Sequence, residues 1–89
     1  MTNRSTVVII GAGGHGRVMA DVLRCQGEAE IAGFLDDALE LQGTTSPVGV
    51  PIIGRTALED IAGCGAGSFI VAIGSNRIRA MLFERCLDA

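Results

Sequence analysis

The early part of the chain places an unbroken β-branched run directly before a glycine-rich turn and an amphipathic helical pattern. Residues 6–10 read Thr-Val-Val-Ile-Ile, and a continuous apolar run is typical of a strand buried on both faces of a parallel sheet. Glycines then interrupt positions 11–16, and apolar residues recur at helical spacing until Gly27, at Val18, Met19, Val22 and Leu23. This order predicts a central strand, a glycine turn and a helix.

The middle of the chain predicts a second strand, a loop and a short edge strand. Residues 31–35 are apolar and end at two aspartates, whereas residues 38–47 carry Gly, Thr, Ser and Pro without periodicity. The segment 50–53 contains Pro51, which cannot donate to a ladder and therefore favours an edge position.

Two further helices and one strand are predicted after residue 54. Thr56 and Glu59 have the spacing of a capping box, which predicts a short helix to about Ala62 that buries Leu58 and Ile61. Residues 69–73 form another continuous apolar run, and the helix that follows has an apolar stripe of Ile78, Met81, Leu82 and Cys86.

Alternating strands and helices in a chain of 89 residues predict one α/β domain over residues 1–89, a Rossmann-like parallel sheet with helices on both faces. The pattern stops on a helix, so the outer edge of the last strand lacks a following strand. We therefore expect the domain to be truncated before its last strand.

Composition narrows the possible partners and location. With 48% hydrophobic and 19% charged residues the chain is expected to fold, and its net charge of −3 disfavours nucleic acid and anionic membranes as partners. No apolar run reaches the length of a membrane span or a signal-peptide core, which favours the cytoplasm. Three cysteines without a C-x-x-C pair suggest reduced thiols in apolar surroundings rather than disulfides or a metal site.

The glycine turn is the strongest candidate for a binding site. Gly11, Gly13 and Gly16 satisfy G-x-G-x-x-G between a predicted strand and a predicted helix. Gly11 would permit the tight turn, Gly13 would let a diphosphate approach the backbone, and Gly16 would let the helix lie close to its strand. The alternative is a tight turn that binds no ligand.

Two acids follow the second predicted strand. Asp36 lies 20 residues after Gly16, where an acid commonly accepts hydrogen bonds from ribose hydroxyls. Asp37 could share that role or cap the next turn, and exposed loop acids are the alternative for both.

Two residues of the first helix are ambiguous. The spacing of His15 to Val18, Met19 and Val22 places it on the face that packs on the sheet, where it could be a core histidine or donate to a phosphate. Arg17 falls on the solvent side but could fold back toward phosphate oxygens. His15 has no evident partner for general-base catalysis, so no catalytic residue is predicted.

The turn after the last strand brings polar groups to the same edge of the sheet if the two strands are neighbours. It consists of Gly74, Ser75, Asn76 and Arg77. Asn76 is either a helix cap or a ligand contact that also caps, and Arg77 could reach a phosphate or face water.

Four motifs occur together in the chain: IIGAGGHGR at 9–17, GFLDD at 33–37, GVPIIG at 49–54, and AIGSN at 72–76 with Arg79. In this order they resemble the N-terminal domain of the PglD-like or NeuD-like family of bacterial sugar O- and N-acetyltransferases. The likeness spans essentially the whole chain. Ser75 departs from the Asp or Asn that the family often has at this position.

The resemblance implies a Rossmann-like domain that binds a UDP-linked amino sugar or sialic acid. In the full protein it would be followed by a left-handed β-helix of hexapeptide repeats that forms a homotrimer, binds acetyl-CoA and supplies the general-base histidine. No such repeat occurs here, so the chain should bind substrate without turning it over. The residues transferred are Gly11, Ala12, Gly13, Gly14, His15, Gly16 and Arg17 for diphosphate and sugar, Asp36 and Asp37 for the uridine, and Gly74, Ser75, Asn76 and Arg77 for the rim.

Two other functions fit the same residues. The first is a regulatory module that binds NAD(H) without chemistry, since the glycine motif also serves dinucleotides. The second is a structural or oligomerisation domain with no small-molecule ligand.

Overall fold

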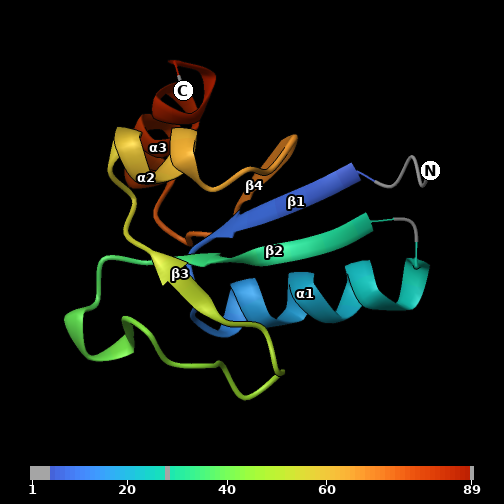
Figure 1. Cartoon of the computed structure of the whole chain (residues 1–89). Helices are drawn as coiled ribbons and strands as arrows, with labels where there is room; N and C mark the ends of the chain where they lie inside the picture. The colour runs from blue at the N-terminus through green and yellow to red at the C-terminus, as the bar shows by residue number, and fades with distance from the viewer. Residues whose placement is uncertain (1–4, 28, 89) are drawn as a thin grey trace.

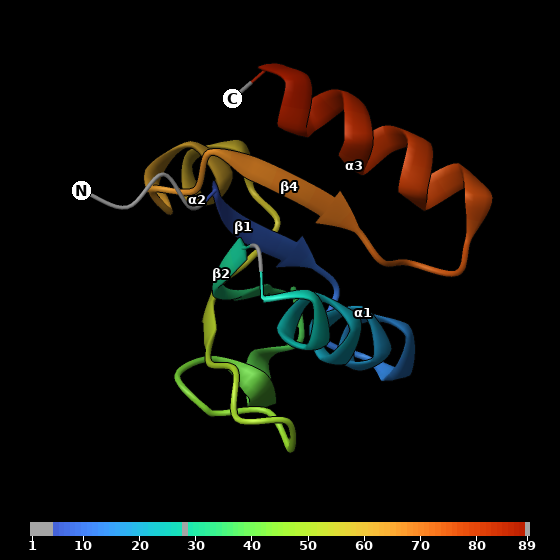
Figure 2. The same ribbon diagram turned by 90° about the vertical axis from the view of Figure 1, so that its right-hand side faces the viewer.

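The computed structural model describes residues 5–27 and 29–88. In chain order the elements are β1 (Ser5–Ile10), α1 (Gly14–Gln26), β2 (Ala29–Leu35), a 3₁₀ turn (Leu39–Leu41), β3 (Ile52–Gly54), α2 (Leu58–Gly63), β4 (Ser68–Val71) and α3 (Asn76–Asp88). The strands form one parallel sheet in the order β3-β2-β1-β4. In Figures 1 and 2, α1 covers one face of this sheet, and α2 and α3 lie on the other side. The predicted fold class is confirmed.

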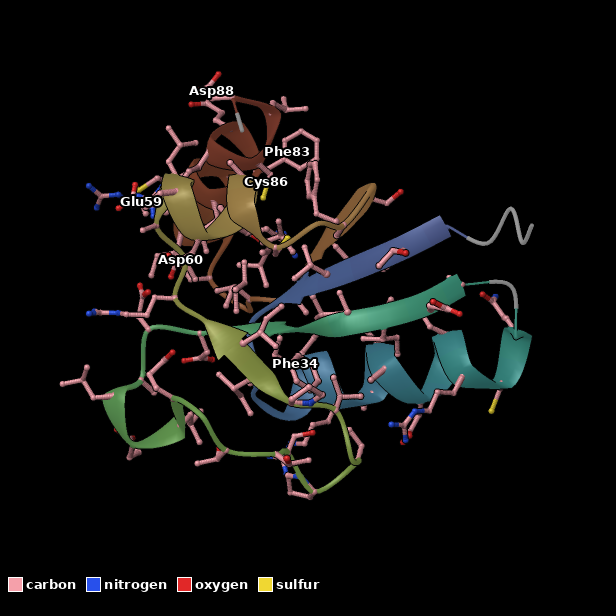
Figure 3. All side chains as sticks on the ribbon, viewed as in Figure 1. Phe34, Glu59, Asp60, Phe83, Cys86 and Asp88 are labelled. Atoms are coloured by element: carbon pink, nitrogen blue, oxygen red, sulfur yellow. The ribbon has the colours of Figure 1, made fainter. Side chains whose placement is uncertain are left out.

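The β-branched run of β1 occupies the centre of the sheet, as predicted, because it pairs with both β2 and β4. Successive side chains of a strand point to opposite faces. Ile9 therefore packs with Phe34 and Ala20 under α1, and Val8 and Ile10 pack with the residues of α2 and α3. Figure 3 shows Phe34 pointing from β2 toward α1.

The face that α1 turns to the sheet differs from the predicted one. Its buried residues are Gly16 and Ala20, with Met19 and Leu23 packed beside them, whereas Val18 and Val22 are 61% and 43% exposed. The cause is a close approach, because a Cβ at Gly16 would lie 1.9 Å from the carbonyl oxygen of Gly11. Gly16 and Ala20 therefore face the sheet. Compared with the prediction, α1 is rotated about its axis so that Val18 and Val22 turn toward solvent.

The connection between β2 and β3 contains no α-helix, and we call its residues 38–51 the strap. The predicted loop is confirmed, apart from the 3₁₀ turn. The strap returns to the sheet through two backbone bonds, from Ile52 N–H to the oxygen of Thr44 and from Phe34 N–H to the oxygen of Pro51. The edge position of β3 also agrees with the prediction.

The capping box at the start of α2 does not form. The helix begins at Leu58 with Ala57 at its N-cap and no side-chain cap, because the amide and hydroxyl of Thr56 both donate to Asp37. Ile61 is buried as predicted, but Leu58 is 43% exposed.

Helix α3 buries less of its stripe than predicted. Leu82 and Cys86 enter the core, but Ile78 and Met81 are about half exposed. Phe83 instead packs edge-to-face on Phe69 of β4, with ring centroids 5.5 Å apart. Figure 3 shows Phe83 and Cys86 on this helix.

Among the helices in the described part of the chain, none combines the length and hydrophobicity needed to cross a bilayer. The cysteines are unpaired, and they differ in surroundings from the common apolar setting that we expected. Cys86 is buried and Cys64 half-buried, but Cys25 is exposed.

Candidate functional site

The turn from β1 into α1 is shaped by glycines at the positions the motif predicts. Gly11 has a φ of +108°, and a Cβ there would lie 2.8 Å from the oxygen of Ala72 on the neighbouring strand segment. Around Gly13, by contrast, a Cβ would meet nothing within 4 Å. The motif therefore packs tightly at Gly11 and Gly16 and leaves Gly13 open to a ligand.

The amino end of α1 has no side chain of its own to satisfy its first amides. Gly13 is the N-cap in extended conformation, no side chain within residues 5–27 and 29–88 caps the helix, and no acid lies in its first turn. Helix N-termini with free amides attract anions because the backbone N–H groups and the helix dipole act together.

Asp36 connects this turn to the strap. One carboxylate oxygen accepts the amide of Ala12 at 2.9 Å and the other accepts the amide of Ala38 at 3.0 Å. Each oxygen keeps a further lone pair. Asp36 therefore connects the glycine turn to the start of the strap, and its carboxylate can still accept a hydrogen bond from a ligand.

A pocket of about 360 Å³ lies between the glycine turn and the strap. One wall consists of residues predicted for the site, and the other consists of strap residues and the start of β3. The first group is Ala12, Gly13, Arg17 and Asp36, and the second is Leu41, Thr44, Thr45, Ser46, Pro47 and Ile52. The pocket sits beyond the carboxyl ends of β1 and β2, where open α/β sheets bind their ligands.

Arg17 lies in the pocket wall, which agrees with the folded-back alternative for this side chain and not with one that faces water. Its side chain is half-buried and lines the pocket. The Nε atom is buried and has no hydrogen-bond partner within residues 5–27 and 29–88. Buried polar atoms without a partner are rare in native proteins, so this donor favours a ligand acceptor in the pocket.

Asp37 is turned away from this pocket, because adjacent side chains of an extended segment point to opposite sides. Its carboxylate accepts the amide of Thr56 at 2.9 Å and the hydroxyl of Thr56 at 2.8 Å. Arg55 lies 3.8 Å away, and Arg85 of α3 donates to the oxygen of Thr56 at 2.6 Å. The backbone hydrogen bond from Thr56 is the main cause that lowers the pKa of Asp37. Asp37 therefore joins the end of β2 to the segment after β3, where Thr56 in turn binds Arg85 of α3, and it does not share the place of Asp36.

His15 also differs from its predicted place. It is exposed, in line with the rotation of α1, and it is not among the residues that line the pocket. Gly14, the first residue of α1, is likewise exposed.

The second turn, residues 74–77, lies at the same edge of the sheet as the glycine turn (Figure 2). Its residues are exposed and are not in the wall of the pocket. The helix cap is Ser75 rather than Asn76, because the Ser75 hydroxyl accepts the amide of Ile78 at 3.4 Å. The side-chain oxygen of Asn76 accepts a hydrogen bond from Arg79.

The strap residues of the pocket were not predicted from the sequence. The run Thr44-Thr45-Ser46-Pro47 predicts only a loop by its lack of periodicity. Its three consecutive hydroxyl residues are the sequence signal of a polar surface at this place.

Comparisons with known proteins find relatives that are similar in sequence and in fold. A family model described as the PglD N-terminal domain matches residues 6–86. A UDP-N-acetylbacillosamine N-acetyltransferase of Bacillus subtilis (strain 168) is 29% identical over 84 residues, which cover 89% of this chain and 36% of that relative.

Two solved structures are similar in fold and sequence. A perosamine N-acetyltransferase from Caulobacter crescentus, in complex with CoA and GDP-perosamine, has a TM-score of 0.75 and 37% identity over 93% of this chain and 38% of its own. The acetyltransferase domain of PglB from Neisseria gonorrhoeae FA1090, in complex with acetyl coenzyme A, has a TM-score of 0.75 and 36% identity over 97% of this chain and 40% of its own.

The parallel sheet, the glycine turn and the pocket at the carboxyl edge define a Rossmann-like domain. The match over residues 6–86 then identifies the family, and the chain belongs to the PglD N-terminal domain family. It spans about 36% of the length of the curated relative. The alternative of an NAD(H)-binding module gains no support from these relatives, all of which are acetyltransferases.

Proposed function

We propose that this chain is the domain that binds a nucleotide-linked amino sugar in an acetyl-CoA-dependent sugar acetyltransferase of bacterial glycan biosynthesis, with UDP as the nucleotide. The relatives named above support the class of substrate, since one acts on a UDP-linked sugar and another is bound to GDP-perosamine. The single observation that carries the proposal is the Nε of Arg17, which has no partner among the described residues and lies in the wall of a pocket at a helix N-terminus that none of their side chains caps.

The pocket suggests a place for each part of such a ligand. The diphosphate lies against the amides from Gly13 onward and against Arg17, where the helix dipole and the guanidinium both favour negative charge. The ribose hydroxyls donate to the remaining lone pairs of Asp36. The sugar extends outward past His15 toward the exposed residues 74–77.

This arrangement binds and orients the substrate but supplies no group for acetyl transfer. We place the acetyl-CoA site and the general base in a region that corresponds to the part of the longer relatives that this chain does not span. The contacts of the homotrimer belong to the same region. We expect the protein to act in the cytoplasm. The chain then acts by presenting the amine or hydroxyl of the sugar in a fixed orientation, which lowers the entropic part of the barrier.

The test is calorimetric titration of the 89-residue chain with UDP-N-acetylglucosamine, UDP and NAD⁺. We expect binding of both UDP compounds and none of NAD⁺. Arg17→Ala should weaken UDP binding about 10- to 100-fold, since a hydrogen bond to a charged group contributes about 1.5–3 kcal/mol. Arg24→Ala is the matched control, because Arg24 is exposed on the same helix and should leave the affinity unchanged.

Two outcomes would overturn the proposal. Binding of NAD⁺ alone would favour the regulatory module, and no response to any of the three compounds would favour a purely structural domain. If Arg17→Ala and Arg24→Ala weaken UDP binding equally, the buried Nε of Arg17 has no specific role in binding.

A further inference from the structure

The two ends of the pocket differ in chemistry. At the glycine turn a cationic side chain and uncapped amides favour an anion. At the strap end the wall carries no charged side chain. It presents the hydroxyl residues Thr44, Thr45 and Ser46 between the apolar Leu41, Pro47 and Ile52. An uncharged surface with a few hydroxyls suits a flat heterocycle that is partly apolar and has hydrogen-bonding edges.

The strap is held in a fixed shape before any ligand binds. The side-chain amide of Gln42 donates to the backbone oxygens of Asp36 and Ala38, which secures the first turn of the strap. At the other end Ser46 and Val50 exchange hydrogen bonds through backbone and side chain. Between these two points Thr45 forms a bridge with Pro51.

The three hydroxyl residues differ in how much hydrogen-bonding capacity remains for a ligand. The Thr44 hydroxyl donates to the oxygen of Leu41 at 2.7 Å, and the Ser46 hydroxyl accepts the amide of Val50 in a buried position. The Thr45 side chain is exposed, and its hydroxyl has no partner in the part of the chain that the structure describes. Thr45 is therefore the strap residue whose hydroxyl can both donate to a ligand and accept from it.

We propose that the strap recognises the nucleobase and that Thr45 is a specificity-determining residue that hydrogen-bonds the edge of a pyrimidine base. This inference rests on the proposed function. A pyrimidine is the smaller class of base, which suits a pocket of about 360 Å³, near the lower end of the range of about 300–1,000 Å³ for ligand pockets. Diphosphate and ribose already take part of that volume.

The proposal would also allow proteins with this one fold to use different nucleotides. One relative acts on a UDP-linked sugar and another is bound to GDP-perosamine. The diphosphate end of the pocket is fixed by the glycine motif, whose Gly16 has no room for a Cβ. The strap carries no such restriction at Thr45, so a change of base is best accommodated there.

The experiment compares UDP, GDP and inorganic pyrophosphate as ligands of the chain and of Thr45→Val, which removes the hydroxyl at nearly constant shape. Nucleotide affinities come from calorimetry and pyrophosphate binding from ³¹P NMR titration. Thr45→Val should weaken UDP about 10-fold and GDP less, and it should leave pyrophosphate binding unchanged. Thr45→Ser should retain UDP affinity within about threefold, since it keeps the hydroxyl.

Ser68→Ala is the control, because Ser68 is an exposed hydroxyl residue at the start of β4 outside this pocket. Thermal unfolding of each variant separates lost affinity from lost fold, and Thr45→Ser provides the folded comparison if Thr45→Val unfolds.

The possible results distinguish this inference from the proposed function. If UDP binds but Thr45→Val leaves its affinity unchanged, or weakens UDP and pyrophosphate equally, base recognition by Thr45 is refuted and the proposed function stands. A preference of the unmodified chain for GDP over UDP would refute both recognition of a pyrimidine and the choice of UDP in the proposed function, but not the class of nucleotide-linked sugar. If the chain binds neither UDP nor pyrophosphate, both proposals fail.

Discussion

Gly16→Ala tests whether the contact between α1 and the glycine turn holds the pocket wall in place. The added Cβ would lie 1.9 Å from the Gly11 oxygen and 3.3 Å from a ring carbon of Phe34. The helix and turn must therefore separate by about 1 Å, and because the clashing atom is a backbone oxygen, the cost falls in the upper part of the overpacking range, at about 2–3 kcal/mol. Alanine gains back about 1 kcal/mol over glycine in a helix. We expect a net loss of about 1–2 kcal/mol, which lowers Tm by about 4–16 °C in a domain of this size.

The assay is thermal unfolding followed by far-UV circular dichroism, with Gly14→Ala as the matched control. Gly14 belongs to the same first turn of α1, but a Cβ there meets nothing within 4 Å. This control should gain up to about 1 kcal/mol. A Gly16→Ala variant as stable as the unmodified chain would show that the close approach does not constrain the fold.

Two further predictions concern titratable side chains. Because hydrogen bonds from Thr56 lower the pKa of Asp37 below its ordinary 3.8, the stability that Asp37 contributes is present above that value and is lost as pH falls through the lower native pKa. Asp37→Asn should therefore flatten the acid limb of unfolding measured by circular dichroism, whereas Asp21→Asn should not; identical acid limbs in both variants would contradict this. Burial raises the pKa of the Cys86 thiol, so a timed pulse of a thiol reagent with peptide mapping should label the exposed Cys25 well before Cys86, and equal rates would argue against it.

Much of the fold could be predicted because its determinants are local. The run of residues 6–10 identifies the central strand, and Gly27 ends α1 in the left-handed conformation expected for a C-cap. Gly16 also has the geometric role that the motif suggests, because its nearest contact is the oxygen of Gly11 in the same strand-turn-helix unit, and Gly11 has the positive φ of a tight turn.

The parts that could not be predicted depend on contacts between distant segments. The buried face of α1 is set by how closely the helix approaches the turn, which moves His15 and Val18 outward and brings Arg17 into the pocket wall. Thr56 has the spacing of a cap, but Asp37, 19 positions earlier, takes both of its donors. Thr45 lies in a segment without periodicity, so only the folded chain shows that it faces the glycine turn.

The carboxylate of Asp36 holds the amides of Ala12 and Ala38 at the same time. The two walls of the cavity are thus joined through one side chain, and neither can shift without disturbing the other. A preformed pocket of this kind loses little conformational entropy when a ligand binds. Ligand binding and release should accordingly be rapid and should not require a loop to open. A substitution in either wall should also change the position of the opposite wall, because Asp36 connects them.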